Sequence, residues 1–260
     1  MNYLEKKEQK LINTFLKKGY VIGKVENKKS LNDINQLIKK SLLKLDIFKE
    51  KKIDLNKFHK INKIKDLNKD RISIINFINS DKKFRLNYLN LAREHLYAIA
   101  GNELMMQKNI NLSIQLPNDK SSLLPVHSDV WSGDSPYEIN LWIPLVNCFK
   151  TKSMYILNKK NYSHFLKQMK KKKIKSSYQI FNLIKNKIKF INIKYGEFLI
   201  FDQTLPHGNI VNDENQTRWS MNCRFKSIFS PYGDKKVGEF FTPITTRATT
   251  YIGQNYKHPF

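Results

Sequence analysis

Three potential metal ligands stand at two places in the chain: His127 and Asp129 are separated by one residue, and His207 follows 78 residues after the aspartate. Two imidazoles and one carboxylate that converge on one point form the ligand set of non-haem Fe(II) centres, which keep further coordination positions open for a cosubstrate and dioxygen. Zinc also accepts this ligand set. The sequence therefore predicts a divalent metal site made of these three side chains.

The local sequence around each ligand favours convergence. Side chains of a strand alternate between its two faces, so His127 and Asp129 would point the same way if they share a strand. His207 follows an apolar segment and stands between a proline and a glycine, which indicates a turn at the end of a strand. A histidine that only fills a core would more often lie within the strand, so we prefer the metal interpretation to a structural one.

A polar face on a later strand suggests an anion site beside the metal. Arg218, Ser220, Asn222 and Arg224 alternate with apolar residues. A buried guanidinium requires an anion opposite it, because an unpaired buried charge is costly. The guanidinium of Arg218 matches a carboxylate in two hydrogen bonds, and the hydroxyl of Ser220 can add a third. We therefore expect these two residues to bind an organic acid, which favours iron over zinc; a surface strand with solvated arginines is the alternative.

Other side chains are weaker candidates for contact with cosubstrate or substrate: Gln115, Asn140 and Arg224. Asn140 and Trp142 share one face of the segment 138–144, although a shift of register by one residue would reverse that face. Trp131 and Tyr137 are candidates for a pocket rim that stacks on a sugar ring, or for ordinary packing. The remaining histidines are expected at the surface, away from the metal: His59, His95, His164 and His258.

Hydrophobic periodicity divides the chain into a helical part and a β part. Apolar residues at three- and four-residue spacing predict helices over 4–16, 31–45 and 86–99, with Ser30 capping the second and Gly101 ending the third. A short strand is expected at 20–22, and the lysine-rich stretch 49–69 is expected to be loop and short helix. From residue 109 the pattern alternates and predicts antiparallel strands over 111–116, 138–144, 152–157, 190–194, 197–202 and 217–226. A basic insert over 161–189 is expected to form one or two helices, and the last thirty residues look irregular.

Composition limits the class of protein. The chain of 260 residues can bury one sizeable core, and it shows neither a transmembrane run nor an apolar signal segment, so a cytoplasmic protein is expected. The net charge of +25 is compatible with a nucleic-acid partner, but only six of the 47 basic residues are Arg, which makes solvated surface the better explanation. Cys148 and Cys223 form no CxxC motif, so reduced, buried thiols are expected.

Taken together, these motifs resemble the Fe(II)/2-oxoglutarate-dependent oxygenases, whose HxD…H…RxS signature is matched by His127-x-Asp129, His207 and Arg218-x-Ser220. The segments 141–145 and 196–208 are similar to the phytanoyl-CoA dioxygenase-like branch. The stretches GEFLIFDQTLPHGN and SPYGDKKVGEFFTP resemble sporadically distributed oxygenases associated with bacterial surface carbohydrate clusters.

This resemblance implies a mainly β fold, a double-stranded β-helix (jelly roll, cupin-like) with N-terminal helices and a helical insert. The whole chain, 1–260, would be a single oxygenase domain. Its parts would be a helical support over 1–108, a β core over 109–228 with a basic insert over 159–189, and a C-terminal extension over 229–260. The resemblance also implies that His127, Asp129 and His207 bind Fe(II) and that Arg218 and Ser220 bind the distal carboxylate of 2-oxoglutarate.

The function expected from these features is hydroxylation, with O2, of a carbohydrate or nucleotide-activated sugar in bacterial surface-polysaccharide biosynthesis. A lipid or an amino-acid-derived metabolite is the alternative substrate for the same chemistry. Two alternatives of other classes are a basic nucleic-acid-binding protein with a vestigial metal site, which rests on the net charge, and a cupin-like sugar-binding module without catalysis. Nucleic acid is an unlikely partner under the main interpretation.

Overall fold

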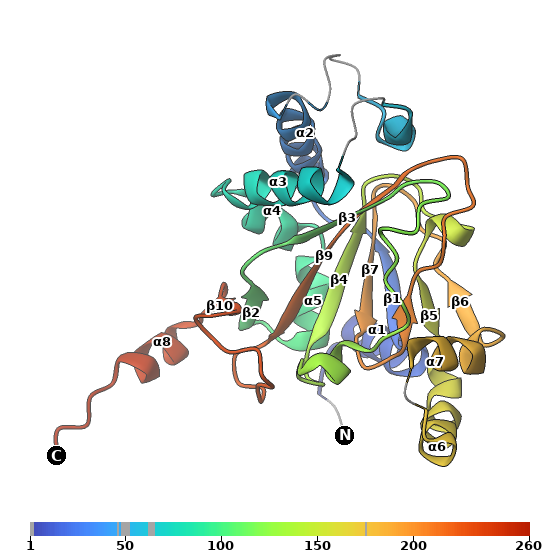
Figure 1. Cartoon of the computed structure of the whole chain (residues 1–260). Helices are drawn as coiled ribbons and strands as arrows, with labels where there is room; N and C mark the ends of the chain where they lie inside the picture. The colour runs from blue at the N-terminus through green and yellow to red at the C-terminus, as the bar shows by residue number, and fades with distance from the viewer. Residues whose placement is uncertain (1–2, 46, 48–52, 62–65, 175) are drawn as a thin grey trace.

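The structure is a computed structural model that describes residues 3–45, 47, 53–61, 66–174 and 176–260. Two antiparallel sheets form its centre (Figure 1). The larger sheet has the strand order β1-β7-β4-β9-β2-β10, and β3 pairs with the other half of the long strand β9. Its strands are β1 (Tyr20–Lys24), β2 (Leu104–Gln107), β3 (Asn111–Gln115), β4 (Ile139–Pro144), β7 (Glu197–Asp202), β9 (Arg218–Ser227) and β10 (Phe241–Pro243).

The smaller sheet has the order β6-β5-β8 and consists of β5 (Tyr155–Leu157), β6 (Ile188–Phe190) and β8 (His207–Gly208). His127 extends this sheet through an antiparallel bridge to His207. Two facing antiparallel sheets of this kind make a double-stranded β-helix, as the family resemblance implies.

Helices cover the outer face of the larger sheet, opposite the smaller one (Figure 1). They are α1 (Lys6–Lys18), α2 (Lys28–Lys44), α3 (Leu67–Asn79), α4 (Phe84–Asn90) and α5 (Arg93–Ala100). The insert forms α6 (Tyr162–Lys172) and α7 (Ser177–Ile184) beside the smaller sheet, and α8 (Ala248–Asn255) extends away from the body near the C-terminus. Short 3-10 turns complete the described elements: η1 (Leu55–Lys60), η2 (Asp129–Ser132), η3 (Lys150–Lys152) and η4 (Lys159–Asn161).

Alternation along β9 separates the core from the interior of the β-helix. The apolar positions of this strand are 0% exposed and pack in the main core with the covering helices: Trp219, Met221, Cys223 and Phe225. Tyr88 of α4 ties the same layer to the sheet by donating its hydroxyl hydrogen to the Leu141 carbonyl at 2.8 Å. The intervening polar side chains of β9 must therefore point between the two sheets.

Several predicted boundaries differ from the observed ones. The helix expected over 86–99 is two helices, α4 and α5, and the chain bends between them at Leu91 and Ala92, which are both 0% exposed. The cap of α2 is wrong in the prediction, because Asn27, and not Ser30, accepts the helix N–H bond. Gly101 ends α5 with a positive φ, as predicted.

The expected strands 152–157 and 190–194 are shorter or shifted, and Lys152 belongs to η3. The helix α3 and the elements β2, β10 and α8 were not predicted. Part of the stretch 49–69 lies outside the described residues. None of the helices in the part of the chain that the structure describes is long and apolar enough to cross a membrane.

Candidate metal centre and cosubstrate site

The three predicted ligands meet at one point between the sheets. His127 Nε2 lies 3.5 Å from Asp129 Oδ1, and His207 Nε2 lies 3.9 Å from the same oxygen. One ligand atom from each of the three side chains can be chosen so that all lie within 4.8 Å of one another. These separations suit three ligands on one face of a single ion.

Both imidazoles are oriented through their second nitrogen. His127 Nδ1 lies 2.8 Å from the Pro125 carbonyl oxygen, and His207 Nδ1 lies 2.9 Å from that of Leu205. A carbonyl oxygen can only accept, so each Nδ1 carries a proton, and it is Nε2 of each ring that would give its lone pair to an ion after losing any proton it holds. That tautomer is the one a metal requires.

The local structure around the ligands differs from the expected strand. His127 is held opposite His207 by a bridge, whereas Asp129 opens the 3-10 turn η2, and its N–H donates to the Gln203 carbonyl at 3.1 Å. His207 itself lies in the two-residue strand β8 rather than in a turn. The ligands converge because backbone hydrogen bonds hold the segment of His127 and Asp129 against the residues that follow β7, including His207. Alternation along one strand does not bring them together.

Burial and neighbouring charges prepare the ligands for a cation. Burial alone would raise the pKa of Asp129, but the hydrogen bond with His127 and the guanidinium of Arg224 outweigh it and hold that pKa well below its usual range. Burial lowers the pKa of His207 to about 4, so this imidazole is neutral at pH 7. A carboxylate and a neutral imidazole are the protonation states in which these groups bind metals.

Arg224 contacts the candidate ligand set directly. Its Nη2 lies 3.0 Å from Asp129 Oδ1, and its Nε donates to Gln203 Oε1 at 3.2 Å. The other oxygen of Asp129, Oδ2, is buried without a hydrogen-bond partner. Arg224 therefore fixes the aspartate through Oδ1, the oxygen that also faces the two imidazoles.

Arg218 is a buried guanidinium without an acidic partner. It is 4% exposed, its Nη2 donates to Ser113 Oγ at 2.9 Å, and its Nε has no hydrogen-bond partner. Burial lowers its pKa to about 10, so it remains a cation at neutral pH. Ser220, two residues along β9, is 1% exposed, and its Oγ is also unsatisfied. An unpaired buried cation next to a free hydroxyl matches the carboxylate-binding group that the sequence predicts.

A cavity of about 650 Å³ joins the metal ligands to Arg218. Asn140 and Trp142 line it, which decides between the two faces that the sequence left open for this strand, and Arg224 lines it too. Gln115 does not line it: the side chain is fully buried and its Nε2 donates to the Ile210 carbonyl at 2.6 Å. The geometry thus gives Gln115 no contact with a ligand in this cavity.

Among the cavity-lining residues that escaped the sequence reasoning are Ser113, Asp134 and Lys235. Ser113 and Gln115 lie two residues apart and so share one face of β3. This alternation was the signal that could have identified Ser113. Asp134 lies in a loop, where alternation gives no information. Burial raises its pKa, and Arg224 partly opposes that shift.

The expected aromatic rim does not line the cavity. Trp131 is 43% exposed and stacks on Phe165 of α6, and Tyr137 is 59% exposed. The other histidines also lie elsewhere. His164 and His258 are exposed, while His59 and His95 are half-buried and pair with Thr217 and Glu26.

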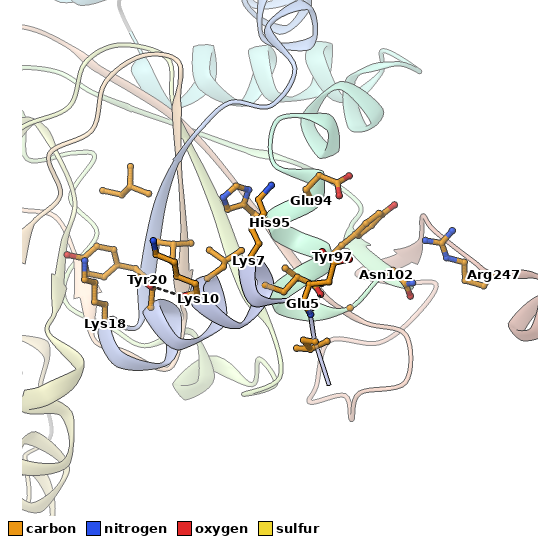
Figure 2. Close-up of a pocket in the computed structure, with 18 of the residues that line it drawn as sticks. Glu5, Lys7, Lys10, Lys18, Tyr20, Glu94, His95, Tyr97, Asn102 and Arg247 are labelled. Atoms are coloured by element: carbon orange, nitrogen blue, oxygen red, sulfur yellow. Dashed lines mark hydrogen bonds between the residues drawn. The ribbon is translucent and has the colours of Figure 1, made fainter. Parts of the chain in front are cut away.

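A larger open groove of about 1060 Å³ runs along α1, β1 and α5 (Figure 2). Charged side chains of both signs line it, among them Glu5, Lys7, Lys10 and Glu94. It contains none of the three candidate ligands, and so the smaller cavity is the candidate reaction site.

Two antiparallel sheets thus enclose the His-Asp-His group, in which Asp129 and His207 are buried and His127 is partly exposed. The sequence matches no protein-family model, and no curated protein matches it. Among solved structures, the chain is similar to the non-haem α-ketoglutarate-dependent carbocyclase SnoK from nogalamycin biosynthesis, with a TM-score of 0.54, 11% identity, and coverage of 94% of this chain and 97% of that one.

It is also similar to HygX from Streptomyces hygroscopicus, solved with nickel and 2-oxoglutarate bound, with a TM-score of 0.54, 11% identity and coverage of 91% of both chains. EctD from S. alaskensis gives a TM-score of 0.57 and 12% identity over 88% of this chain and 79% of that one. At these identities the comparisons establish the shared fold. The phytanoyl-CoA dioxygenase-like branch stays a prediction.

Proposed function

We propose that the protein is an Fe(II)- and 2-oxoglutarate-dependent oxygenase. The observation that carries this proposal is the pairing of the His127–Asp129–His207 group with the unpaired, buried guanidinium of Arg218 in one cavity. A structural zinc site would explain the first group but would leave Arg218 without an anion. The proposed reaction converts 2-oxoglutarate, O2 and a substrate C–H into succinate, CO2 and a C–OH.

Each of the site residues would have a separate role that follows from its position. His127, Asp129 and His207 would hold the ion, which supplies activation of dioxygen when bound. Arg218 would hold the distal carboxylate of 2-oxoglutarate, with Ser113 and Ser220 completing its hydrogen bonds. Arg224 would keep Asp129 in its ligating orientation. Asp129, His207 and Arg218 are buried between the sheets, and a lower local dielectric strengthens their electrostatic contacts.

For the substrate we propose a carbohydrate or nucleotide-activated sugar of bacterial surface-polysaccharide biosynthesis, turned over in the cytoplasm. The supporting features are the resemblance of the 196–209 and 230–243 segments to oxygenases of such clusters and the polar cavity. Asn140, Asn222 and Asn209 line this cavity beside the charged residues. The Oδ1 of Asn140 is buried without a hydrogen-bond partner, and a lipid would leave it so.

The class is tested with purified protein, Fe(II) and 2-oxoglutarate by measuring succinate, with and without a panel of sugars and sugar nucleotides. Wild type should form succinate, and His127→Ala should form none. His164→Ala is the matched control, because His164 is exposed on the insert. Succinate formation that persists in His127→Ala contradicts the proposal, whereas stimulation by no sugar removes only the substrate class.

The net charge of +25 leaves a basic nucleic-acid-binding protein as the alternative, and the same purified protein can test it. Nucleic-acid binding that weakens steeply with salt and is unchanged in His127→Ala, in a protein that forms no succinate, would favour a basic binding protein over the enzyme.

A further inference from the structure

Two loops that are distant in sequence are fastened together at the cavity. We call them the entrance loops, residues 132–135 and 231–235. Asp234 N donates to the Gly133 carbonyl at 2.9 Å, and Ser135 Oγ donates to the Pro231 carbonyl at 2.7 Å. Gly233 allows this approach, because an added Cβ there would collide with the Gly133 carbonyl oxygen. The first entrance loop begins directly after η2, and so it is tied to the candidate ligand Asp129.

Asp134, in the first entrance loop, has one engaged and one free carboxylate oxygen. Its Oδ2 lies 3.6 Å from Arg224 Nη2, and the same nitrogen contacts Asp129 Oδ1 at 3.0 Å. The side chain is only 2% exposed, and its Oδ1 is buried without a hydrogen-bond partner. Asp134 lines the cavity of the candidate ligands. A single guanidinium, that of Arg224, therefore links Asp134 to the candidate metal ligand Asp129.

A free acceptor of this kind requires a donor. A buried polar oxygen without a partner costs more than a paired one, so the site is completed when something donates to Oδ1. The charge of Asp134 is already opposed by Arg224, and Lys235 of the second entrance loop also lines the cavity. A neutral hydroxyl suits this balanced environment better than a second cation.

We propose that Asp134 anchors the substrate by accepting a hydrogen bond from a substrate hydroxyl at Oδ1, and that the entrance loops thereby select polyhydroxylated substrates such as sugars or inositols. The assignment rests on the proposed function, since it places this hydroxyl beside the ion that would react with a neighbouring C–H. Asp134 would be a substrate-binding residue, and Gly133 and Gly233 would be positioning residues for it.

The experiment uses the full chain loaded with diamagnetic Zn(II) and 2-oxoglutarate, and probes it with methyl α-glucoside, methyl α-galactoside and myo-inositol by saturation-transfer NMR. The proteins are wild type, Asp134→Asn and the control Asp213→Asn, in which the replaced carboxylate is exposed on a loop. Loading and thermal unfolding are measured for each protein, so that binding is compared per loaded, folded site.

At least one probe should bind wild type and Asp213→Asn with equal affinity and bind Asp134→Asn at least tenfold more weakly. Equal affinity for Asp134→Asn, or no saturable binding of any probe to wild type, overturns the assignment. If wild type retains neither Zn(II) nor 2-oxoglutarate, the proposed function fails instead, and probe binding is then compared on the unloaded proteins. A variant that has lost its fold is replaced by Asp134→Ser in the same comparison.

Discussion

His127 and His207 exchange both of their backbone hydrogen bonds: His127 N donates to the His207 carbonyl at 3.0 Å, and His207 N donates to the His127 carbonyl at 2.9 Å. Directly opposed residues of an antiparallel pair present their side chains on the same face. The register of this pair therefore sets the distance between two of the three candidate ligands, and their ring centroids lie 4.3 Å apart. A slip by one residue in either segment would turn one imidazole away from the cavity.

Metal binding should stabilise the fold, because the three ligands come from segments that only the folded chain brings together. At a free metal concentration one hundred times the Kd, linkage gives about 2.7 kcal/mol, which corresponds to a rise in Tm of roughly 5–10 °C for a domain of this size. Differential scanning calorimetry of chelator-treated protein, with and without Ni(II), measures the shift. His127→Ala should show almost none of it, and an equal rise in that variant contradicts the assigned ligands.

Replacing Arg218 by Lys should weaken 2-oxoglutarate binding at least about tenfold, because a lysine ammonium keeps the charge but loses the two-bond match to a carboxylate. The pKa of Arg218, lowered by burial to about 10, lies well above neutral pH, so wild-type affinity should stay constant from pH 7 to pH 8. Calorimetric titration of the Ni(II)-loaded protein measures both effects. Arg247→Lys, at an exposed position, is the control; similar losses in the two variants would count against the role of Arg218.

Gly133→Ala should cost more stability than Gly238→Ala. Both glycines have a positive φ, +86° and +83°, at which a side chain costs about 1–2 kcal/mol. Only at Gly133 would the new Cβ also collide, with the side chain of Asp234 in the other entrance loop. Urea unfolding of the two variants separates the contact from the backbone effect. Equal losses would mean that the entrance loops are not held against each other in solution.

The two cysteines should resist alkylation in the folded protein. Cys148 and Cys223 are both fully buried, and burial raises the pKa of each thiol to about 12, so almost no thiolate exists at pH 8. Iodoacetamide should label the native protein at least about 100-fold more slowly than the protein in guanidinium, because the thiolate is the reactive form. Mass spectrometry follows the labelling, and rapid native labelling at either position would show that the core there opens.

The sequence predicted most reliably what depends on local alternation. The polar face of β9 and its apolar face were both correct, since a strand with Trp219 and Phe225 in the core must turn Arg218 and Arg224 inward. The shared face of Asn140 and Trp142 on β4 followed from the same period, but the structure was needed to show that this face points inward. The candidate metal ligands were predicted from the chemistry of their residue types, two histidines and one aspartate.

The parts that failed depend on contacts between distant segments. Asp129 reaches the ion position from a 3-10 turn held by the Gln203 carbonyl, and no local pattern specifies that bond. Ser113 becomes important only because β3 pairs with β9 opposite Ser220. The helix α8 has no buried face and so no hydrophobic period to detect, as its residues are exposed or half-buried.

The second entrance loop, residues 231–235, follows the end of β9 and contributes Lys235 to the cavity wall. It supplies none of the candidate ligands and no part of either sheet. Under the proposed function, sequence changes at Lys235 would alter the wall that a substrate meets without replacing a candidate metal ligand.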